Sequence, residues 1–324
     1  MREILFNQIK EMGFDHLRIS LTKDCNGACH FCHNEGQKKG QLGDRALPHL
    51  TILSLNDYAY IARFFKSYFK SVTFTGGEPT LAQNLPEIVH IFKKEGYQTK
   101  LVTNGFLLTN ELQQRLKLVG LDCVHFSLPT LNPVQHGTLF NVSDKFALVM
   151  KNFENAVHHF KGRVKINFMA LPDMTMPNEL IPLSNLSAKW GVPICFLTTL
   201  ENSATVAQEV LTYLQDHIGQ VWEENVPHKY QNKQVCYFEN GAVWEFYDFR
   251  QEEYRTVAFE NKICKDCPLK EKCVEGPYAL RITETGDLRP CLIREDNIVL
   301  FQENGYVNER RDLTQQEGEV PALI

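Results

Sequence analysis

The sequence lacks the features by which membrane, secreted and nucleic-acid-binding proteins are usually detected. No segment is apolar enough to cross a bilayer, and the first residues, MREILFNQIKEMGF, lack the long apolar core of a signal peptide. The net charge is -5, which gives no support for a nucleic-acid groove or for an anionic membrane surface as a partner. No internal repeat or low-complexity tract interrupts the chain. We therefore expect a cytoplasmic globular protein with no membrane or nucleic-acid partner.

Cysteine, in contrast, is abundant, with ten residues in the chain. In a reducing compartment, cysteines are more often metal ligands or catalytic groups than halves of disulfides. Three of them lie within residues 25–32 and four within residues 264–291. Two separate groups toward opposite ends of the chain predict two metal sites.

Strand-like and helix-like segments alternate about six times through the first two thirds of the chain. This alternation is typical of βα units around a parallel sheet. Six units are fewer than the eight of a closed barrel, so we predict an open, partial (β/α)6 TIM-like barrel, with a doubly wound sheet as the alternative. The expected strands are 17–22, 71–77, 99–105, 123–128, 164–170 and 192–198, and the expected helices are 54–69, 85–95, 109–119, 142–160, 177–189 and 205–218.

The pattern changes after about residue 220. VCYFENGAVWEFYDF predicts a hairpin that turns at Asn240-Gly241, because this pair favours the positive φ angles of a tight turn. ALRITETGDLRPCLI predicts a second hairpin that turns near Thr285-Gly286. A cysteine-rich stretch, ICKDCPLKEKC, lies between them. We therefore predict a barrel domain over 1–225 and a small β-rich, metal-stabilised unit over 226–324.

The first cysteine group, in LTKDCNGACHFCHNEG, comes directly after the first expected strand. Thiolates of Cys25, Cys29 and Cys32 suit an iron–sulfur cubane, in which cysteine sulfur binds the irons. The fourth iron is then free to bind a cofactor. A zinc knuckle is the alternative, since zinc prefers four protein ligands and His30 or His33 could complete the set.

The CxxxCxxC pattern after the first strand, together with TGGEP after the second, resembles the radical S-adenosylmethionine (SAM) superfamily. The resemblance implies a [4Fe–4S] cluster on the three cysteines, which reduces bound SAM to give a 5′-deoxyadenosyl radical. It places Phe31 near the adenine of SAM. The alternative is that Phe31 packs in the hydrophobic core without contacting the cofactor. Gly76 and Gly77 would let the backbone approach the cofactor, and Glu78 would pair with its ammonium group.

Further segments, LRISLT, TNGFLL, GLDCVHFSL, VKINFM and RITETGDLRPCL, are similar to the GTP 3′,8-cyclase family of molybdenum-cofactor biosynthesis. By this resemblance Gly77 and Ser127 would contact SAM. The nucleotide-contacting positions would be Arg18, Thr103, Lys165 and Arg281. The alternative for Arg18 and Lys165 is an ion pair with a local carboxylate.

Several positions depart from that family's pattern. Ser71 and Thr73 replace basic residues before TGGEP, Ala279 replaces an arginine, Pro129 replaces an acid, and the chain ends in PALI without a Gly-Gly tail. Each missing cation removes a charged hydrogen bond to phosphate, typically worth ~1.5–3 kcal/mol. We therefore expect a small polar substrate in a biosynthetic pathway, a different metabolite or a peptide, with GTP as the competing possibility.

The second cysteine group has the spacing C-x2-C-x5-C-x17-C, formed by Cys264, Cys267, Cys273 and Cys291. It resembles the twitch extension of the superfamily, which implies a second [4Fe–4S] cluster. Zinc on four thiolates is the rival, and Cys236 could replace one ligand. The resemblance also implies a flavodoxin or ferredoxin as the reductant. Alternation leaves open whether His125 points into the barrel or toward the helices.

Overall fold

The computed structural model describes residue 14 and residues 16–171, 176–198, 203–226, 232–248, 264, 267, 268, 270, 278–289 and 291–292. Cys273, predicted as a ligand of the second cluster, lies outside the described residues, as do the last residues of the chain. Among the described residues, no helix is both long enough and apolar enough to cross a membrane.

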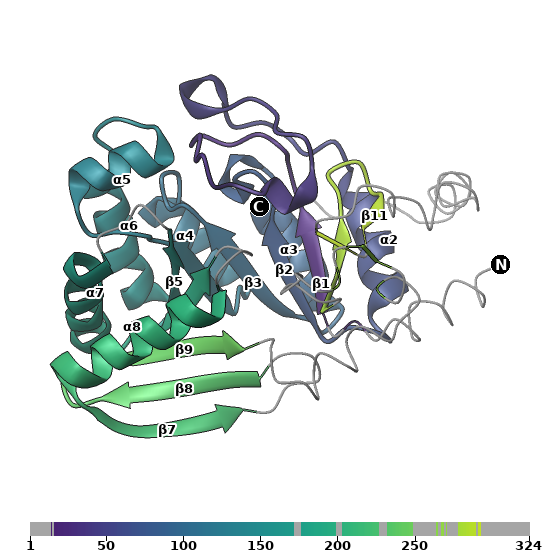
Figure 1. Cartoon of the computed structure of the whole chain (residues 1–324). Helices are drawn as coiled ribbons and strands as arrows, with labels where there is room; N and C mark the ends of the chain where they lie inside the picture. The colour runs from purple at the N-terminus through teal and green to yellow at the C-terminus, as the bar shows by residue number, and fades with distance from the viewer. Residues whose placement is uncertain are drawn as a thin grey trace.

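Six parallel strands form the centre of the protein, and neighbours in the sheet follow the order of the chain. The sheet is open and does not close into a barrel (Figure 1), which confirms the predicted partial (β/α)6 barrel. All six expected strands are present within a few residues. They are β1 (His16–Ser20), β2 (Ser71–Thr75), β3 (Gln98–Thr103), β4 (Cys123–Ser127), β5 (Val164–Ala170) and β6 (Ile194–Thr198).

The helices line the outside of the curved sheet (Figure 1). One of them, α5 (Pro133–Phe140), was not expected, although Asn132 caps its start and Pro133 occupies its first turn, where proline is favoured. The others match the expected segments. They are α2 (Leu55–Phe65), α3 (Leu85–Lys94), α4 (Asn110–Leu118), α6 (Phe146–His159), α7 (Met176–Trp190) and α8 (Ser203–Ile218), with short 3-10 turns η1 (Asn34–Gly36), η2 (Gly43–Arg45) and η3 (Pro79–Leu81).

Antiparallel hairpins extend both edges of the parallel sheet. β9 (Val243–Asp248) pairs in parallel with β6 and continues through β8 (Asn232–Phe238) to β7 (Gln220–Val226). β10 (Ala279–Ile282) pairs in parallel with β1 and turns back into β11 (Leu288–Arg289). Both predicted hairpins are therefore confirmed, and their turns contain Gly241 and Gly286 at φ 87° and 88°. The domain boundary near residue 226 stays a prediction.

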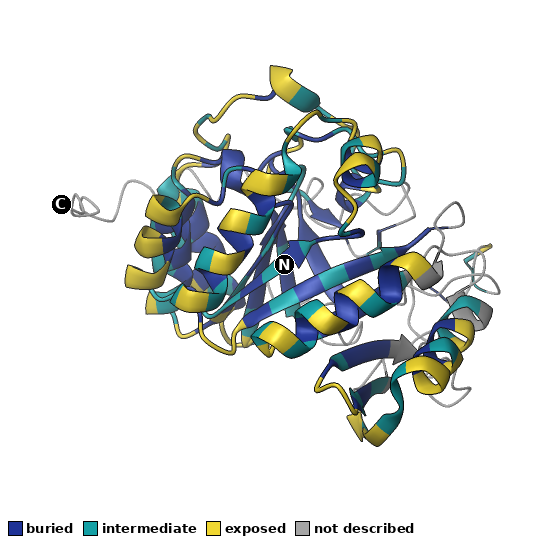
Figure 2. Ribbon diagram, turned by 90° about the vertical axis from the view of Figure 1, so that its left-hand side faces the viewer, coloured by how far each residue is buried: buried dark blue, intermediate teal, exposed yellow. Residues whose placement is uncertain are grey.

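The two faces of the sheet differ in chemistry. On the outer face, apolar side chains such as Phe74 and Phe126 are fully buried against the helices, where their rings meet Phe92 and Phe153 edge-on at 5.4 Å. Because successive side chains of a strand alternate between faces, the intervening residues point into the partial barrel. Figure 2 shows the dark, buried sheet between half-exposed helices. The inner face is mostly polar and includes Arg18, Thr73, Lys100, His125, Lys165, Asn167 and Glu245.

Candidate active site

The first three cysteines lie in the loop that follows β1, residues 21–42, which we call the cluster loop. This loop leaves the carboxyl end of β1, the edge where parallel α/β folds place their chemistry. Its backbone is fixed by hydrogen bonds from the Cys25 amide to the Gln41 carbonyl (2.9 Å) and from the Ala28 amide to the Phe140 carbonyl (2.8 Å). Cys25, Cys29 and Cys32 are all partly exposed. The loop thus holds its thiols at the open end of the sheet.

Backbone amides and one side-chain amide surround the thiols. The Gly27 amide donates to Cys25 Sγ at 3.4 Å, and the Asn34 amide donates to Cys32 Sγ at 3.3 Å. Asn104 Nδ2 from the end of β3 lies 3.8 Å from Cys25 Sγ. Burial raises the pKa of the Cys25 thiol, and burial together with Cys32 raises the pKa of Cys29 to about 12. Cys25 and Cys29 are therefore protonated without metal, and metal binding to them must release protons.

The three thiols of the cluster loop are the donors that an iron–sulfur cubane requires. Among the described residues, no three His, Cys, Asp or Glu side chains gather closely enough to hold one metal ion. In a cubane each iron takes its own thiolate, so three separated sulfur ligands are suitable. The proposed extra zinc ligand His33 accepts the Glu35 amide at Nδ1 (3.0 Å), and the His30 ring contacts Phe31 edge-on at 5.3 Å.

The glycines of TGGEP bring the end of β2 directly against the cluster loop. The Gly77 amide donates to the Thr22 carbonyl at 2.6 Å, and the Glu78 amide donates to the Asp24 carbonyl at 2.8 Å. A Cβ atom at Gly77 would lie 2.0 Å from the Asp24 carbonyl oxygen, and one at Gly76 would lie 2.3 Å from that of Thr22. The close approach that glycine permits here is made to the loop that carries the cysteines.

Glu78 is almost fully buried and joins the ends of β2 and β3. Its carboxylate accepts hydrogen bonds from the Thr103 hydroxyl (2.6 Å), the Asn104 amide (2.8 Å) and the Thr80 amide (3.1 Å). Burial raises its pKa in spite of these donors. Thr103, a predicted nucleotide contact, therefore donates its hydroxyl to Glu78, a predicted SAM contact.

The other predicted SAM contacts lie at the same edge of the sheet. Phe31 is partly buried and packs against the main core. Ser127 ends β4 and pairs with Asn167 of β5 in the sheet register. The contacts of Phe31, Gly76, Gly77, Glu78 and Ser127 with SAM remain predictions, but all five residues belong to the carboxyl ends of β1, β2 and β4 or to the loops that follow them.

Arg18 and Arg281, two predicted nucleotide contacts, converge on one buried carboxylate. Glu35 accepts Arg18 Nε at 3.2 Å and Arg281 Nε at 3.1 Å, and a second Arg18 nitrogen also binds it. The Thr75 hydroxyl donates to the same carboxylate at 3.1 Å. Burial alone would raise the pKa of Glu35, but the two guanidinium groups hold it far below its usual value. The sequence analysis assigned Glu35 no role.

Lys165, the remaining predicted nucleotide contact, is also paired. Its ammonium group lies 2.6 and 2.7 Å from the two oxygens of Glu245, and Lys233 lies 2.8 Å from the same carboxylate. Cys195 donates its thiol to Glu245 at 3.3 Å. Burial opposes ionisation of Glu245, yet the two lysines lower its pKa. Neither Glu245 nor Lys233 was predicted, because both lie far from Lys165 in the sequence.

His125 points into the barrel, which resolves the question that alternation left open. It pairs with Lys165 in the sheet register, and its Nδ1 lies 3.3 Å from Asn167 Oδ1. Burial, Lys165 and Lys100 lower its pKa to about 3, so the ring is neutral at physiological pH.

The second cysteine group is described only in part. Cys264 is buried, Cys267 and Cys291 are partly exposed, and the Cys267 amide donates to the Cys264 carbonyl at 3.1 Å in a tight turn. Cys236, the possible substitute ligand, is fully buried in β8.

Comparison with known proteins identifies the architecture. Residues 19–180, which contain the cluster loop, the end of β1 and the whole of β2 to β5, match the family model of the Radical SAM superfamily. The chain belongs to this superfamily. Membership implies that this radical SAM protein is an enzyme that uses a [4Fe–4S] cluster and SAM, and its thiol-bearing loop has the donor set that such a cluster requires.

Relatives of similar length carry the name probable GTP 3′,8-cyclase. The chain is 28% identical over 287 residues to the protein from Methanococcus maripaludis (strain C5), covering 87% of this chain and 86% of the relative. It is 30% identical over 292 residues to the protein from Saccharolobus islandicus (strain L.S.2.15), covering 88% and 85%. The resemblance to this family that the sequence motifs predicted is therefore confirmed.

Solved structures of low sequence identity share the fold. Streptococcus suis SuiB bound to S-adenosylmethionine aligns with a TM-score of 0.58 at 16% identity, covering 89% of this chain and 62% of SuiB. The chain thus spans less than two thirds of SuiB. anSMEcpe with bound AdoMet aligns with a TM-score of 0.55 at 15% identity, covering 94% of this chain and 84% of that one.

Proposed function

We propose that this radical SAM enzyme acts on a small polar substrate other than a nucleoside triphosphate, either a metabolite or a peptide, in a biosynthetic pathway. Cys25, Cys29 and Cys32 would hold the cluster, while Phe31, Gly76, Gly77, Glu78 and Ser127 would contact SAM. When bound, the reduced cluster and SAM supply a 5′-deoxyadenosyl radical that takes a hydrogen atom from the substrate. The chain's own residues would orient both molecules at the open end of the sheet and exclude water from them.

The observation that carries the choice of substrate is the pairing of the inner-face cations. Arg18 and Arg281 bind Glu35, and Lys165 and Lys233 bind Glu245, so two buried carboxylates occupy donors that a triphosphate would need. A triphosphate requires several charge-assisted donors, and it is repelled by a carboxylate already bound to them. An uncharged polar substrate does not need several charged donors and is not repelled by the carboxylates.

GTP 3′,8-cyclase activity is the second candidate. Identity of 28–30% to probable GTP 3′,8-cyclases across most of the chain supports it. Against it stand the two occupied carboxylate sites and the replacement of basic residues by Ser71 and Thr73. Peptide modification is compatible with the fold, since SuiB bound to its precursor peptide SuiA aligns with a TM-score of 0.60.

A single assay separates these candidates. Anaerobically reconstituted, reduced protein is incubated with SAM in the presence and absence of GTP, and 5′-deoxyadenosine is measured. We expect slow SAM cleavage that GTP does not accelerate, and none in the Cys29→Ala variant. GTP-dependent formation of 5′-deoxyadenosine would establish the cyclase and refute the proposal.

We further propose a second [4Fe–4S] cluster on Cys264, Cys267, Cys273 and Cys291, within a twitch-like domain over 226–324, and a flavodoxin or ferredoxin as electron donor. The turn from Cys264 to Cys267 supports the C-x2-C part of this ligand set. Analysis of iron, sulfide and zinc after anaerobic purification tests it. Roughly eight irons per chain correspond to two cubanes, whereas about four irons with zinc would replace the second cluster by a zinc site.

A further inference from the structure

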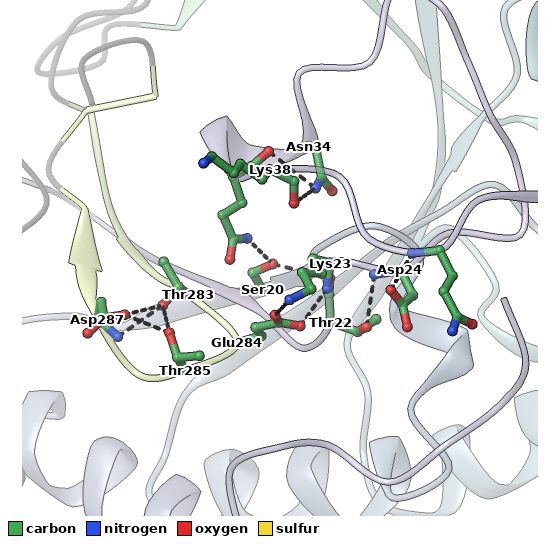
Figure 3. A network of polar contacts seen from close by, with 12 residues as sticks. Ser20, Thr22, Lys23, Asp24, Asn34, Lys38, Thr283, Glu284, Thr285 and Asp287 are labelled. Atoms are coloured by element: carbon green, nitrogen blue, oxygen red, sulfur yellow. Dashed lines mark hydrogen bonds and ion pairs between the residues drawn. The ribbon is translucent and has the colours of Figure 1, made fainter.

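The hairpin of β10 and β11 contacts the cluster loop at three points. Glu284, in the turn of the hairpin, accepts the Lys23 amide at 2.8 Å and lies 3.2 Å from its ammonium group (Figure 3). Arg281 of β10 binds Glu35, and Arg289 of β11 donates to the Gly36 carbonyl. Cys291, of the second cysteine group, follows β11 two residues later in the sequence.

The contact at Glu35 is the most deeply buried of the three. Its side chain is 5% exposed and that of Arg281 is 4% exposed, whereas Lys23 is 49% exposed. Glu35 also binds Arg18 of β1 and Thr75 of β2, so one carboxylate joins the loop to three strands. Buried, charge-assisted hydrogen bonds are much stronger than exposed ion pairs, because water does not compete for them. Glu35 is therefore a buried, charge-assisted attachment of the loop to three strands.

The backbone at Glu35 connects this attachment to the cluster cysteines. Asn34 and Glu35 adopt left-handed conformations with φ 46° and 52°, which non-glycine residues rarely populate and which surrounding contacts must hold. In this turn the Asn34 amide donates to Cys32 Sγ at 3.3 Å. A Cβ atom at Gly36 would lie 2.2 Å from the Leu292 carbonyl oxygen, so the C-terminal segment also packs directly on the turn.

We propose that Glu35 is a positioning residue that, held between Arg18 and Arg281, fixes the turn after Cys32 so that the C-terminal hairpin sets the geometry of the cluster loop. The inference rests on the proposed role of Cys25, Cys29 and Cys32 as cluster ligands. It concerns the shape of the cluster site and does not depend on which substrate is used.

The test compares Glu35→Gln and Arg281→Gln with wild-type protein, each reconstituted to the same iron content. The electron paramagnetic resonance spectrum of the reduced cluster is recorded with and without SAM, and the SAM dissociation constant is measured. We expect both variants to alter the SAM-induced spectral change and to weaken SAM binding about tenfold, or about 1.4 kcal/mol. The double variant should be no worse than Glu35→Gln alone, since that single change already removes the contact with Arg281.

Two further variants separate positioning from general damage. Glu95→Gln makes the same chemical change in the exposed pair with Lys66 (2.9 Å) and should leave both measurements unchanged. Arg281→Lys keeps the charge and should recover part of the lost affinity. If Glu35→Gln does not fold, the two Arg281 variants still decide, because they alter the same contact from β10, far away in the sequence.

Hydrogen exchange of the metal-free protein supplies a readout that needs no cluster. Amides of residues 33–37 should exchange faster in both glutamine variants than in wild type or Glu95→Gln. The proposal would be overturned if Glu35→Gln and Arg281→Gln showed the same spectra, the same SAM affinity and the same hydrogen exchange as the wild-type protein. A wild-type protein whose cluster does not respond to SAM would instead refute the proposed function.

Discussion

Glu35 and Glu245 are both 5% exposed and each binds two basic side chains, yet the two sites differ in what they can do. Glu35 lies in a loop and is held by two arginines, whose planar groups fix direction as well as distance. Glu245 lies in strand β9 and is held by Lys165 and Lys233, whose ammonium groups end flexible chains. The Glu35 site therefore suits positioning, whereas the lysines at Glu245 could turn toward another anion once that carboxylate is neutralised.

The largest expected difference between the two regions concerns the cysteines beside each carboxylate. Cys32→Ala removes a proposed cluster ligand near Glu35, so the iron of this cluster, about half of the iron of a chain with two cubanes, and 5′-deoxyadenosine formation should be lost. Cys123→Ala, on the inner face near Lys165, should retain both. Iron analysis and the SAM-cleavage assay check this pair. Full activity in Cys32→Ala, or zinc bound by the cluster loop, would contradict the assignment.

Neutralising Glu245 should have a smaller effect than removing Cys32. It should lower the stability of the protein and raise its affinity for anions. Glu245→Gln removes the carboxylate that Lys165 and Lys233 share, and the loss of these charged hydrogen bonds suggests a loss of about 2 kcal/mol in unfolding free energy. Urea denaturation measures this loss.

The same variant tests the substrate argument, because the released lysines should bind an added anion. Inorganic tripolyphosphate should bind Glu245→Gln about tenfold more tightly than wild type, a change of about 1.4 kcal/mol. Isothermal titration calorimetry measures both affinities. If wild-type protein already binds tripolyphosphate as tightly as the variant, Glu245 does not exclude phosphate from this face.

Whether a feature of the fold or of the site could be predicted from the sequence depended on how far apart its interacting residues lie in the chain. The cluster cysteines and TGGEP are short local patterns, and the six strands repeat a simple alternation, so all were predictable. Strand β7 was missed because most of its side chains are at least partly exposed at the sheet edge, which removes the apolar alternation.

Long-range charge pairing could not be predicted in the same way. Arg281 and Glu35 are separated by 246 positions, and Glu245 and Lys165 by 80, so no local pattern joins them. The possibility that Arg18 and Lys165 bind carboxylates was recognised, but only the register of the strands identifies the partners. Once β10 pairs beside β1, Arg18 and Arg281 occupy matched positions and can reach the same group.

His125 extends the comparison to pH, because burial, together with Lys165 beside Glu245, keeps this ring neutral. Burial, Lys165 and Lys100 lower its pKa from 6.5 to about 3. Between these values the unfolded chain binds a proton that the folded protein does not, so stability falls as the pH drops below 6.5. The slope from this one residue is at most about 1.4 kcal/mol per pH unit.

Replacing this ring therefore tests whether the Glu245 side of the barrel is sensitive to acid. His125→Gln should reduce the loss of stability between about pH 6.5 and 5. Urea denaturation of the variant and of wild type at several pH values checks this. Identical profiles for wild type and His125→Gln would mean that the folded protein protonates this ring as readily as the unfolded chain.

The smallest expected effect comes from a Glu→Gln substitution in an exposed ion pair. Comparing it with Glu245→Gln shows how much of the stabilisation depends on burial of the pair. Lys66 and Glu95 are 2.9 Å apart, as close as the buried pairs, but the lysine is 54% exposed. Exposed ion pairs usually contribute about 0–1 kcal/mol, because water and salt screen the charges. Glu95→Gln should therefore change the unfolding free energy by about 0.5 kcal/mol or less, and added salt should remove the difference. A loss as large as that of Glu245→Gln would mean that charge pairing itself, independent of burial, stabilises this protein.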